Sequence, residues 1–296
     1  MKKTIKNLVI ICIMCFALAV IMSACQEIVK KGGLEKSKYK SYVYDTRLNE
    51  VGITRDVTDF WDVTTKYKGL KPKQISFEGK EYNLEYKCTT GIALTPYEED
   101  EYRDEEGNSF CFNADTGELT GCFFVYWGAD KQDYTYEPIT IESAQTMAED
   151  FASKYIKVEG YVVKSSTSYY PEAISENYAL YDFSFRKYVG DVRLTDGFSV
   201  TIGNDGRLVS FSSLTAGLFS GDEKLDFDYE EVEQSIKEKM KSLLGDKNEY
   251  GYTIGDNKVL AYTPKGELIL LSEISLSQPP SQKAQALLLV LATVID

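Results

Sequence analysis

The densest group of ionisable side chains lies between residues 98 and 108. The segment EEDEYRDEEGN places seven carboxylates within eleven residues. Carboxylate oxygens are the ligands that hard cations such as calcium prefer. The spacing does not fit an EF-hand, and neighbouring carboxylates repel one another. We therefore expect residues 98–108 to form a solvated loop, with a weak cation site as the alternative.

Three cysteines, Cys88, Cys111 and Cys122, are candidates for thiol chemistry. Cys111 and Cys122 flank a turn, and a two-residue loop at 116–117 would place them directly opposite each other. A four-residue loop at 114–117 would place them diagonally, which strains a disulfide. Cys88 competes for either partner. Two outcomes stay open, a disulfide between Cys111 and Cys122 or buried free thiols.

The chain of 296 residues contains no histidine. Histidine is the usual general base and the commonest zinc ligand, so histidine-containing triads and HExxH zinc sites are excluded. Hydrolysis of glycans by two carboxylates is not excluded, but nothing singles out a pair among the 46 acids. The formal net charge of −13 argues against nucleic acid, whose phosphates require clustered Lys and Arg. We expect a non-catalytic protein without a cofactor.

Residues 1–24 have the pattern of a signal peptide. Three lysines and no acid precede an apolar run from Leu8 to Met22, and Ser23, Ala24 and Cys25 follow. This layout resembles a bacterial lipoprotein signal, in which a peptidase cuts before a lipid-modified cysteine. The resemblance implies a lipid on Cys25 that holds the chain on the extracytoplasmic face of a membrane, and an uncleaved anchor is the alternative. Removal of residues 1–24 takes the formal net charge from −13 to −16.

Two amphipathic segments predict helices that position these groups. Thr140 can cap a helix that runs to Tyr155. Asp228 opens a second helix with a capping box, and Gly245 ends it. A weaker helix candidate covers residues 57–67. Each apolar stripe predicts a helix packed on a sheet.

Three glycine-containing turns predict β-hairpins. They are centred on Gly117, Gly206 and Gly266, and in each a charged residue and a leucine follow the glycine. The first two turns are 89 residues apart, and the helix starts at Thr140 and Asp228 are 88 residues apart. Because two independent markers recur at nearly the same spacing, they indicate an internal repeat of helix, strand and hairpin.

These markers divide the chain into a signal peptide, a polar tether and three units of the repeat. The apolar segment 284–295 is too short to span a bilayer and is expected to form a last buried strand or helix. The predicted fold class is therefore α+β, with tandem units of one helix packed on an antiparallel sheet. The expected parts are 1–24 (signal peptide), 25–41 (tether), 42–130 (divergent first unit), 131–222 (second unit) and 223–296 (partial third unit).

The order of these motifs resembles the PepSY-like repeat family of the YcdB/YcdC type. The resemblance rests on ITIESA at 139–144, YDFSFR at 181–186 and the turns at 115–118 and 204–206, and it covers roughly residues 75–275. It implies an α+β fold in which one helix packs across an antiparallel sheet. Members are secreted or membrane-attached bacterial proteins, and PepSY modules are associated with binding or inhibiting peptidases. The family carries no catalytic residues.

The sequence therefore predicts a lipid-anchored surface protein that binds other proteins or regulates a peptidase. Its expected partners are the membrane, through the lipid on Cys25, and an extracytoplasmic peptidase or wall-associated protein. One alternative is a carboxylate-dependent hydrolase of cell-wall glycan, which needs two acids about 5–10 Å apart. Another is a solute-binding lipoprotein, but its two lobes with parallel sheets fit poorly with a hairpin-rich chain.

Overall fold

The computed structural model describes residues 37–46, 53–56, 63–125, 136–169, 178–219, 227–245, 251–277 and 287–295. The chain divides into two compact units, Met1–Lys38 and Tyr39–Asp296, and every described helix and strand belongs to the second. The predicted signal peptide and Cys25 lie outside the described residues.

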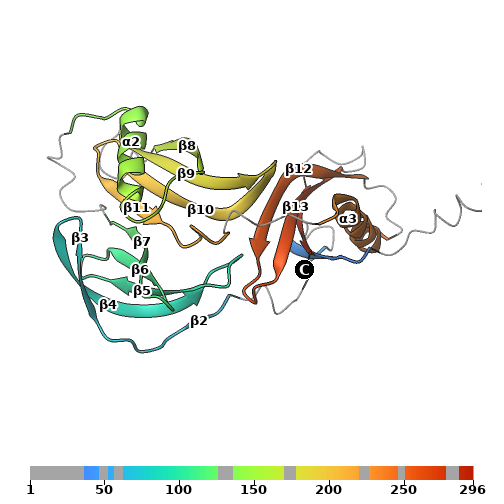
Figure 1. Cartoon of the computed structure of the whole chain (residues 1–296), viewed down its shortest axis with the longest axis horizontal. Coiled ribbons are helices and arrows are strands. Elements are labelled where there is room, and N and C mark those ends of the chain that lie inside the picture. Colours follow the sequence, from blue (N-terminus) through green and yellow to red (C-terminus); the bar gives the residue numbers. More distant parts are fainter. Residues whose placement is uncertain are drawn as a thin grey trace, which may run out of the picture. The chain divides into compact units, whose positions relative to one another are not determined.

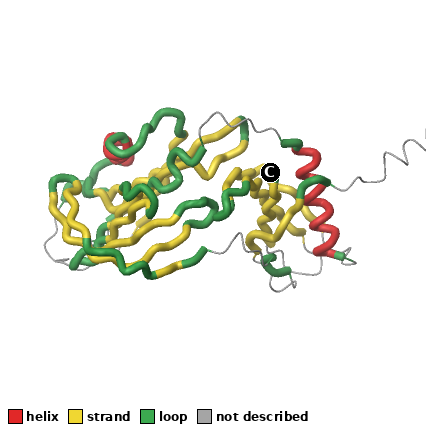
Figure 2. The backbone as a smooth tube through the Cα atoms, turned by 60° about the horizontal axis from the view of Figure 1, so that its bottom comes forward, coloured by secondary structure: helices red, strands yellow, loops and turns green. Residues whose placement is uncertain are grey.

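Strands dominate the described part of the chain, and they join in one mixed sheet (Figure 1). The helices α2 and α3 accompany these strands in the described part of the chain, and Figure 2 draws them in red. The elements are β1 (Lys40–Thr46), β2 (Thr65–Lys66), β3 (Lys73–Phe77), β4 (Lys80–Gly91), β5 (Glu98–Arg103), β6 (Ser109–Asn113), β7 (Leu119–Phe123), α2 (Ile141–Ala152), β8 (Val162–Tyr169), β9 (Ala179–Val189), β10 (Val192–Gly203), β11 (Leu208–Ser212), α3 (Tyr229–Leu244), β12 (Gly251–Tyr262), β13 (Leu268–Ser277) and β14 (Leu287–Val294).

The sheet has the strand order β1-β14-β13-β12-β10-β11-β7-β6-β5-β4-β2, with β3 attached to β4 and the β8–β9 hairpin attached to β10. All pairs are antiparallel except β10 with β12, in which Arg193 lies opposite Val259. β1 returns to pair with β14, so that Lys40 lies opposite Val294. The sheet therefore depends on pairings between residues far apart in the chain.

Both predicted helices are confirmed, although the first ends at Ala152 rather than at Tyr155. The Thr140 hydroxyl accepts a hydrogen bond from the Ser143 backbone N–H, and the Asp228 carboxylate accepts one from that of Glu230. These bonds satisfy N–H groups that a helix start leaves open. Gly245 ends α3 with a positive φ of 52°, which glycine adopts readily. α2 lies against β9 and β10, and α3 lies against β1 and β14.

Each helix covers a separate hydrophobic core. The core under α2 is rich in aromatic rings, among them the fully buried Phe110 and Phe183. The core under α3 is mainly aliphatic, with Ile236 and Met240 of the helix at its centre. β10 contributes to both cores and joins them.

The predicted hairpins are confirmed as β6–β7, β10–β11 and β12–β13. β7 and β11 lie 89 residues apart in the chain, as the repeat spacing requires, and they pair with each other. The apolar C-terminal segment forms β14, in which Leu289 and Leu291 are fully buried. Of the weak helix candidate at 57–67, residues 57–62 lie outside the described part, and Thr65–Lys66 form β2.

The predicted fold class is wrong. Over the described residues, the structure is a large mixed sheet of 14 strands with two short helices, not a series of α+β units of one helix on its own sheet. The hairpins do not close into separate sheets, because β7 pairs with β11 and β10 pairs with β12. Local periodicity predicts strands and turns, but it contains no information on which hairpins pair with each other.

Candidate functional site

A tight turn at residues 104–108 forms one wall of the candidate site. Asn108 is buried, and its side-chain amide donates to the carboxylates of Asp104 at 2.8 Å and Glu106 at 3.3 Å. Its side-chain oxygen accepts a hydrogen bond from the backbone N–H of Val125. Gly107 takes a φ of 90°, which closes the turn. Asn108 therefore holds the carboxylates of Asp104 and Glu106 in place.

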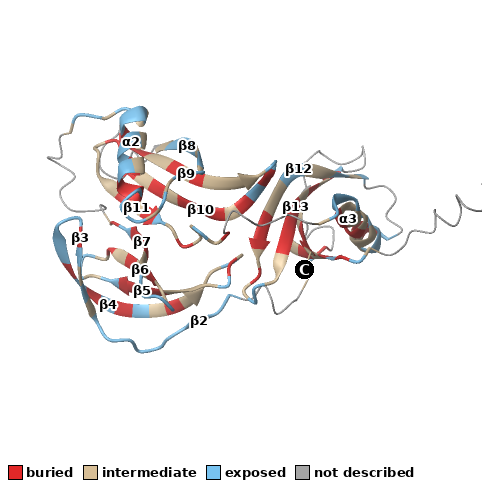
Figure 3. Ribbon diagram, in the orientation of Figure 1, coloured by how far each residue is buried: buried red, intermediate tan, exposed pale blue. Residues whose placement is uncertain are grey.

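The β3–β4 hairpin forms the opposite wall. Along β4, Tyr82 and Leu84 are buried, whereas Glu81, Asn83 and Glu85 are exposed (Figure 3). This alternation follows from the period of two in a strand. The exposed side chains of β4 therefore face solvent, while the ring of Tyr82 belongs to the core under α2.

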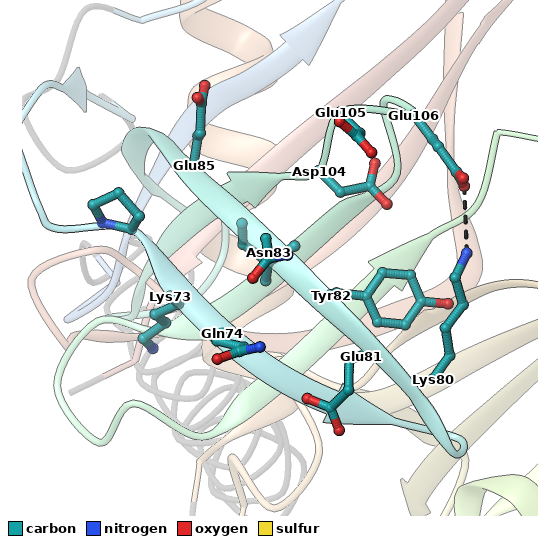
Figure 4. Close-up of a pocket in the computed structure, with 12 residues that line it drawn as sticks. Lys73, Gln74, Lys80, Glu81, Tyr82, Asn83, Glu85, Asp104, Glu105 and Glu106 are labelled. Atoms are coloured by element: carbon teal, nitrogen blue, oxygen red, sulfur yellow. Dashed lines mark hydrogen bonds and ion pairs between the residues drawn. The ribbon is translucent and has the colours of Figure 1, made fainter.

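A hollow of 610 Å³ lies between these two walls (Figure 4). Glu81, Glu85 and the acids of the turn line it, together with Lys73 and Lys80. A second hollow of 380 Å³ shares Lys80, Tyr82 and Glu106 with the first. The two hollows adjoin at these residues, and we call the two together the acidic hollow. Its lining residues include Phe77, Glu78, Glu81, Tyr82, Asn83, Glu85, Asp104, Glu105, Glu106 and Phe124.

The two lysines leave the acidic hollow with an excess of negative charge. The Lys80 ammonium lies 3.4 Å from a Glu106 carboxylate oxygen and 4.9 Å from the centroid of the Tyr82 ring (Figure 4). The Lys73 ammonium lies 3.8 Å from the centroid of the Phe112 ring, and burial lowers the pKa of Lys73. Of the other acids, Glu85 pairs with Lys87 at 3.1 Å and Glu78 pairs with Lys154 at 2.7 Å, both in exposed ion pairs. The surface therefore suits a ligand that carries positive charge and apolar side chains.

The acidic segment 98–108 is largely a strand, and the prediction of a solvated loop is wrong for residues 98–103. These residues form β5, which pairs with β4 on one side and with β6 on the other. Only Asp104 to Asn108 form a turn. Alternation along β5 directs Asp100 and Tyr102 to the core and leaves Glu99 and Glu101 on the other face. Among the described residues, no group of three or more cysteine, aspartate or glutamate side chains is placed to hold a metal ion.

The three cysteines beside this strand are free thiols. Cys111 lies opposite Gly121, whereas Cys122 lies opposite Phe110. The two cysteines are therefore one register position apart, and their side chains lie on opposite faces of the sheet.

The turn and a bulge together produce this register. Asn113 and Glu118 close a four-residue loop at 114–117, and a register shift at Thr120 then moves the ladder by one residue. The four-residue loop is one of the two loops that the sequence allows at this turn, but no signal in the sequence marks the bulge. Burial raises the pKa of Cys111 to about 12 and also raises that of Cys122, so both remain protonated thiols at neutral pH.

Glu99 is the described carboxylate whose pKa is raised, and it lies outside the acidic hollow. Burial is the main cause, and the neighbouring Glu101 adds to it. The Thr120 hydroxyl donates to Glu99 at 2.5 Å and opposes the shift in part. A glycan hydrolase needs an acid of raised pKa and a second carboxylate in one cleft. The position of Glu99 does not favour that alternative.

Replacement of Glu99 by glutamine is expected to stabilise the protein at pH 7. A carboxyl whose pKa is raised in the folded state favours folding below its ordinary value of 4.5, and this contribution is lost as the pH rises through the folded value. Glutamine removes the ionisation and can still accept the Thr120 hydrogen bond. Thermal unfolding should show a higher Tm for Glu99→Gln at pH 7 and a difference that vanishes near pH ~4.

Glu101→Gln is the matched control, because Glu101 lies on the same face but pairs with Arg103 at 2.7 Å. It is not expected to raise the Tm at pH 7. A Glu99→Gln protein that is less stable than the wild type at pH 7 would show that ionised Glu99 is favourable in the fold.

Sequence reasoning missed the hairpin wall of the site. The alternation Glu81-Tyr82-Asn83-Leu84-Glu85 predicts a strand with one polar face, and this signal could have marked the wall. The predicted lipid site Cys25 lies outside the described residues. Within the described part, neither helix is both long and apolar enough to cross a membrane.

Comparison with known proteins places the chain in a family. Residues 51–215 match the model of the family described as the YcdB, YcdC repeated domain. The match covers more than half of the chain, which belongs to this family. The span includes both walls of the acidic hollow, α2 and β11.

One solved structure is similar over much of the chain. It is an uncharacterized protein from Eubacterium rectale ATCC 33656, solved at 1.45 Å resolution, with 12% identity over 75% of this chain and 72% of its own. The TM-score of 0.30 is too low to define a shared fold. No curated protein matches the chain.

Proposed function

We propose that this chain is a non-catalytic protein-binding module, held by a lipid on Cys25 at the extracytoplasmic face of a membrane. The acidic hollow carries the proposal, because it joins fixed carboxylates to aromatic rings on one surface. Such a surface suits an extended segment with basic and apolar side chains. The partner would be a peptidase or a wall-associated protein. The resemblance to PepSY modules supports a regulatory effect on a peptidase.

Two physical properties of the hollow favour a protein segment over a small solute. Its carboxylates are distributed over both walls, from Glu81 and Glu85 on the hairpin to Glu105 on the turn. The buried rings of Phe77 and Phe124 reach only its second part. A ligand that contacts Glu81, Glu85 and Glu105 together with these two rings must therefore extend across both parts.

A peptide-binding measurement tests this proposal. The probe is a fluorescein-labelled peptide of twelve residues in which lysines alternate with serine and phenylalanine, and the control replaces each lysine by glutamate. We expect saturable binding of the basic peptide, detected by fluorescence anisotropy, that weakens as salt is added. The acidic peptide should not bind. Equal binding of both peptides, or of neither, would contradict the proposal.

Replacement of Cys25 by alanine is expected to abolish the attachment of lipid to the protein, because alanine has no thiol that could be modified. Cell fractionation and metabolic labelling with a fatty acid measure this effect. A Cys25→Ala protein that stays in the membrane fraction and still carries labelled lipid would overturn the proposed anchor.

A further inference from the structure

The outer edge of β8 is open in the part of the chain that the structure describes. β8 pairs with β9 over its full length, from Val162 opposite Arg186 to Tyr169 opposite Ala179, and with no other strand. The register contains no shift, so the strand is regular. Four consecutive side chains at its centre, from Lys164 to Thr167, are exposed. Alternate backbone N–H and C=O groups along this edge are therefore available to another strand.

Two other margins of the sheet are less open to pairing, and among the described residues the outer edge of β3, which pairs only with β4, is five residues long. At the outer edge of β1, Val43 exchanges hydrogen bonds with Asp56, whose backbone N–H donates to the Val43 carbonyl and whose carboxylate accepts from the Val43 N–H. At the opposite end of the strand order, β2 is only two residues long. β8 has eight residues and neither protection. Its edge is therefore the better template for pairing.

The sequence of β8 also lacks the usual devices that block strand addition. It contains no proline, no bulge and one charged residue, Lys164. Its central residues Ser165, Ser166 and Thr167 have small side chains with a hydroxyl group. In a chain with a formal net charge of −13, this stretch carries no acidic residue that would repel a second copy.

We propose that β8 pairs with β8 of a second copy of this chain in a two-fold symmetric, antiparallel arrangement. A two-fold axis normal to the sheet requires a residue at the axis to face its own equivalent, because opposite residues in an antiparallel pair point to the same side. The axis therefore passes beside Ser165 or Ser166. In the first register, with Ser165 at the axis, Lys164 faces Ser166 of the other copy. In the second register, with Ser166 at the axis, Lys164 faces Ser168 of the other copy. No like charges oppose each other in either register.

Within the described residues, α2 lies against β9 and β10 rather than at the β8 margin. An interface of one strand pair is smaller than the roughly 1,200–2,000 Å² of a stable complex, so the dimer should be weak. Its effect would be to join two sheets and present two acidic hollows in one assembly.

Sedimentation equilibrium of the compact unit Tyr39–Asp296 tests the pairing. We expect a monomer–dimer equilibrium for the wild type. Ser166→Lys places like charges opposite each other in both registers, against Lys164 in the first and against itself in the second. It should raise the dimer dissociation constant about tenfold or more. Ser166→Thr is the neutral control and should leave the constant unchanged, and circular dichroism should show that both variants remain folded.

Ser166→Glu distinguishes the two registers. The introduced carboxylate should preserve the dimer if it faces Lys164 of the other copy, and weaken it if it faces its own equivalent. A wild type that stays monomeric at the highest concentration, or a Ser166→Lys protein that dimerises like the wild type, would overturn the proposal. Protection of the β8 amides by a different protein but not by a second copy would assign the edge to a foreign strand and would also overturn it.

Discussion

Replacement of Asp196 by alanine is expected to lower the free energy of unfolding by about 3–5 kcal/mol. The Asp196 side chain is 0% exposed, and it lies where β10 passes from the core under α3 to the core under α2. Its carboxylate accepts four hydrogen bonds. The donors are the Tyr161 hydroxyl at 2.6 Å, the Gly217 N–H at 3.0 Å, the Phe219 N–H at 3.1 Å and the Lys187 ammonium at 3.2 Å.

The loss of stability arises because alanine has no oxygen that could accept hydrogen bonds from these donors. Lys187 would lose its counter-ion at a position where its side chain is only 22% exposed. The N–H of the buried Phe219 would lose its acceptor where water reaches poorly, whereas Gly217 is exposed and its N–H also donates to the Tyr161 hydroxyl. The register of β10 against β9 is already interrupted between Arg193 and Gly197, so backbone pairing cannot replace these bonds.

Urea denaturation followed by circular dichroism measures the Asp196→Ala effect. Glu233→Ala is the matched control, because Glu233 forms an exposed ion pair with Lys237 and should contribute less than ~1 kcal/mol. Asp196→Asn should fall between the two, since it keeps one acceptor oxygen. A loss below about 1 kcal/mol for Asp196→Ala would show that the carboxylate is not needed where the cores meet.

Reversal of charge at Glu81, Glu85 and Glu105 is expected to weaken binding of the basic peptide by about 10–100-fold. The three side chains are exposed, and the exposed ion pair of Glu85 with Lys87 should contribute little to stability, so the fold should persist. Each exposed pair with a lysine contributes about 0.2–1 kcal/mol, and substitution by lysine replaces attraction with repulsion. The triple variant should also acquire affinity for the acidic control peptide. Anisotropy titrations measure both constants.

A variant with the same change in net charge separates the local effect from the global one. Asp115, Glu118 and Glu159 are exposed and do not line the acidic hollow. Their replacement by lysine should weaken the basic peptide only slightly, and high salt should remove this difference. Equal effects of the two triple variants would mean that net charge, rather than the hollow, attracts the peptide.

Much of the local structure could be predicted from the sequence. Thr140 and Asp228 mark the helix starts because side-chain capping is a local interaction. Gly117 and Gly206 mark two hairpins because their turns require a positive φ, which is observed at 73° and 83°. These features depend on residues within a few positions of one another.

The features that sequence reasoning misses depend on distant residues. The loop prediction for β5 fails because the charge of this strand hides an alternation in which only Asp100 and Tyr102 are buried. The Thr89 hydroxyl donates to Asp100 from the neighbouring strand and makes this burial tolerable. The role of Asp196 likewise depends on Tyr161 and Phe219, which come from two separate segments. No local pattern in the sequence contains these contacts.

The proposed function depends on binding of a protein in the acidic hollow. Cross-linking in cells tests this binding most directly. Asn83 is exposed and lines the hollow (Figure 4), so a photoreactive phenylalanine analogue at this position lies against any bound partner. We predict a light-dependent adduct with a second protein that is lost when Glu81, Glu85 and Glu105 are changed to lysine. The absence of an adduct, or an adduct that survives the charge reversal, would contradict binding of a protein in the acidic hollow.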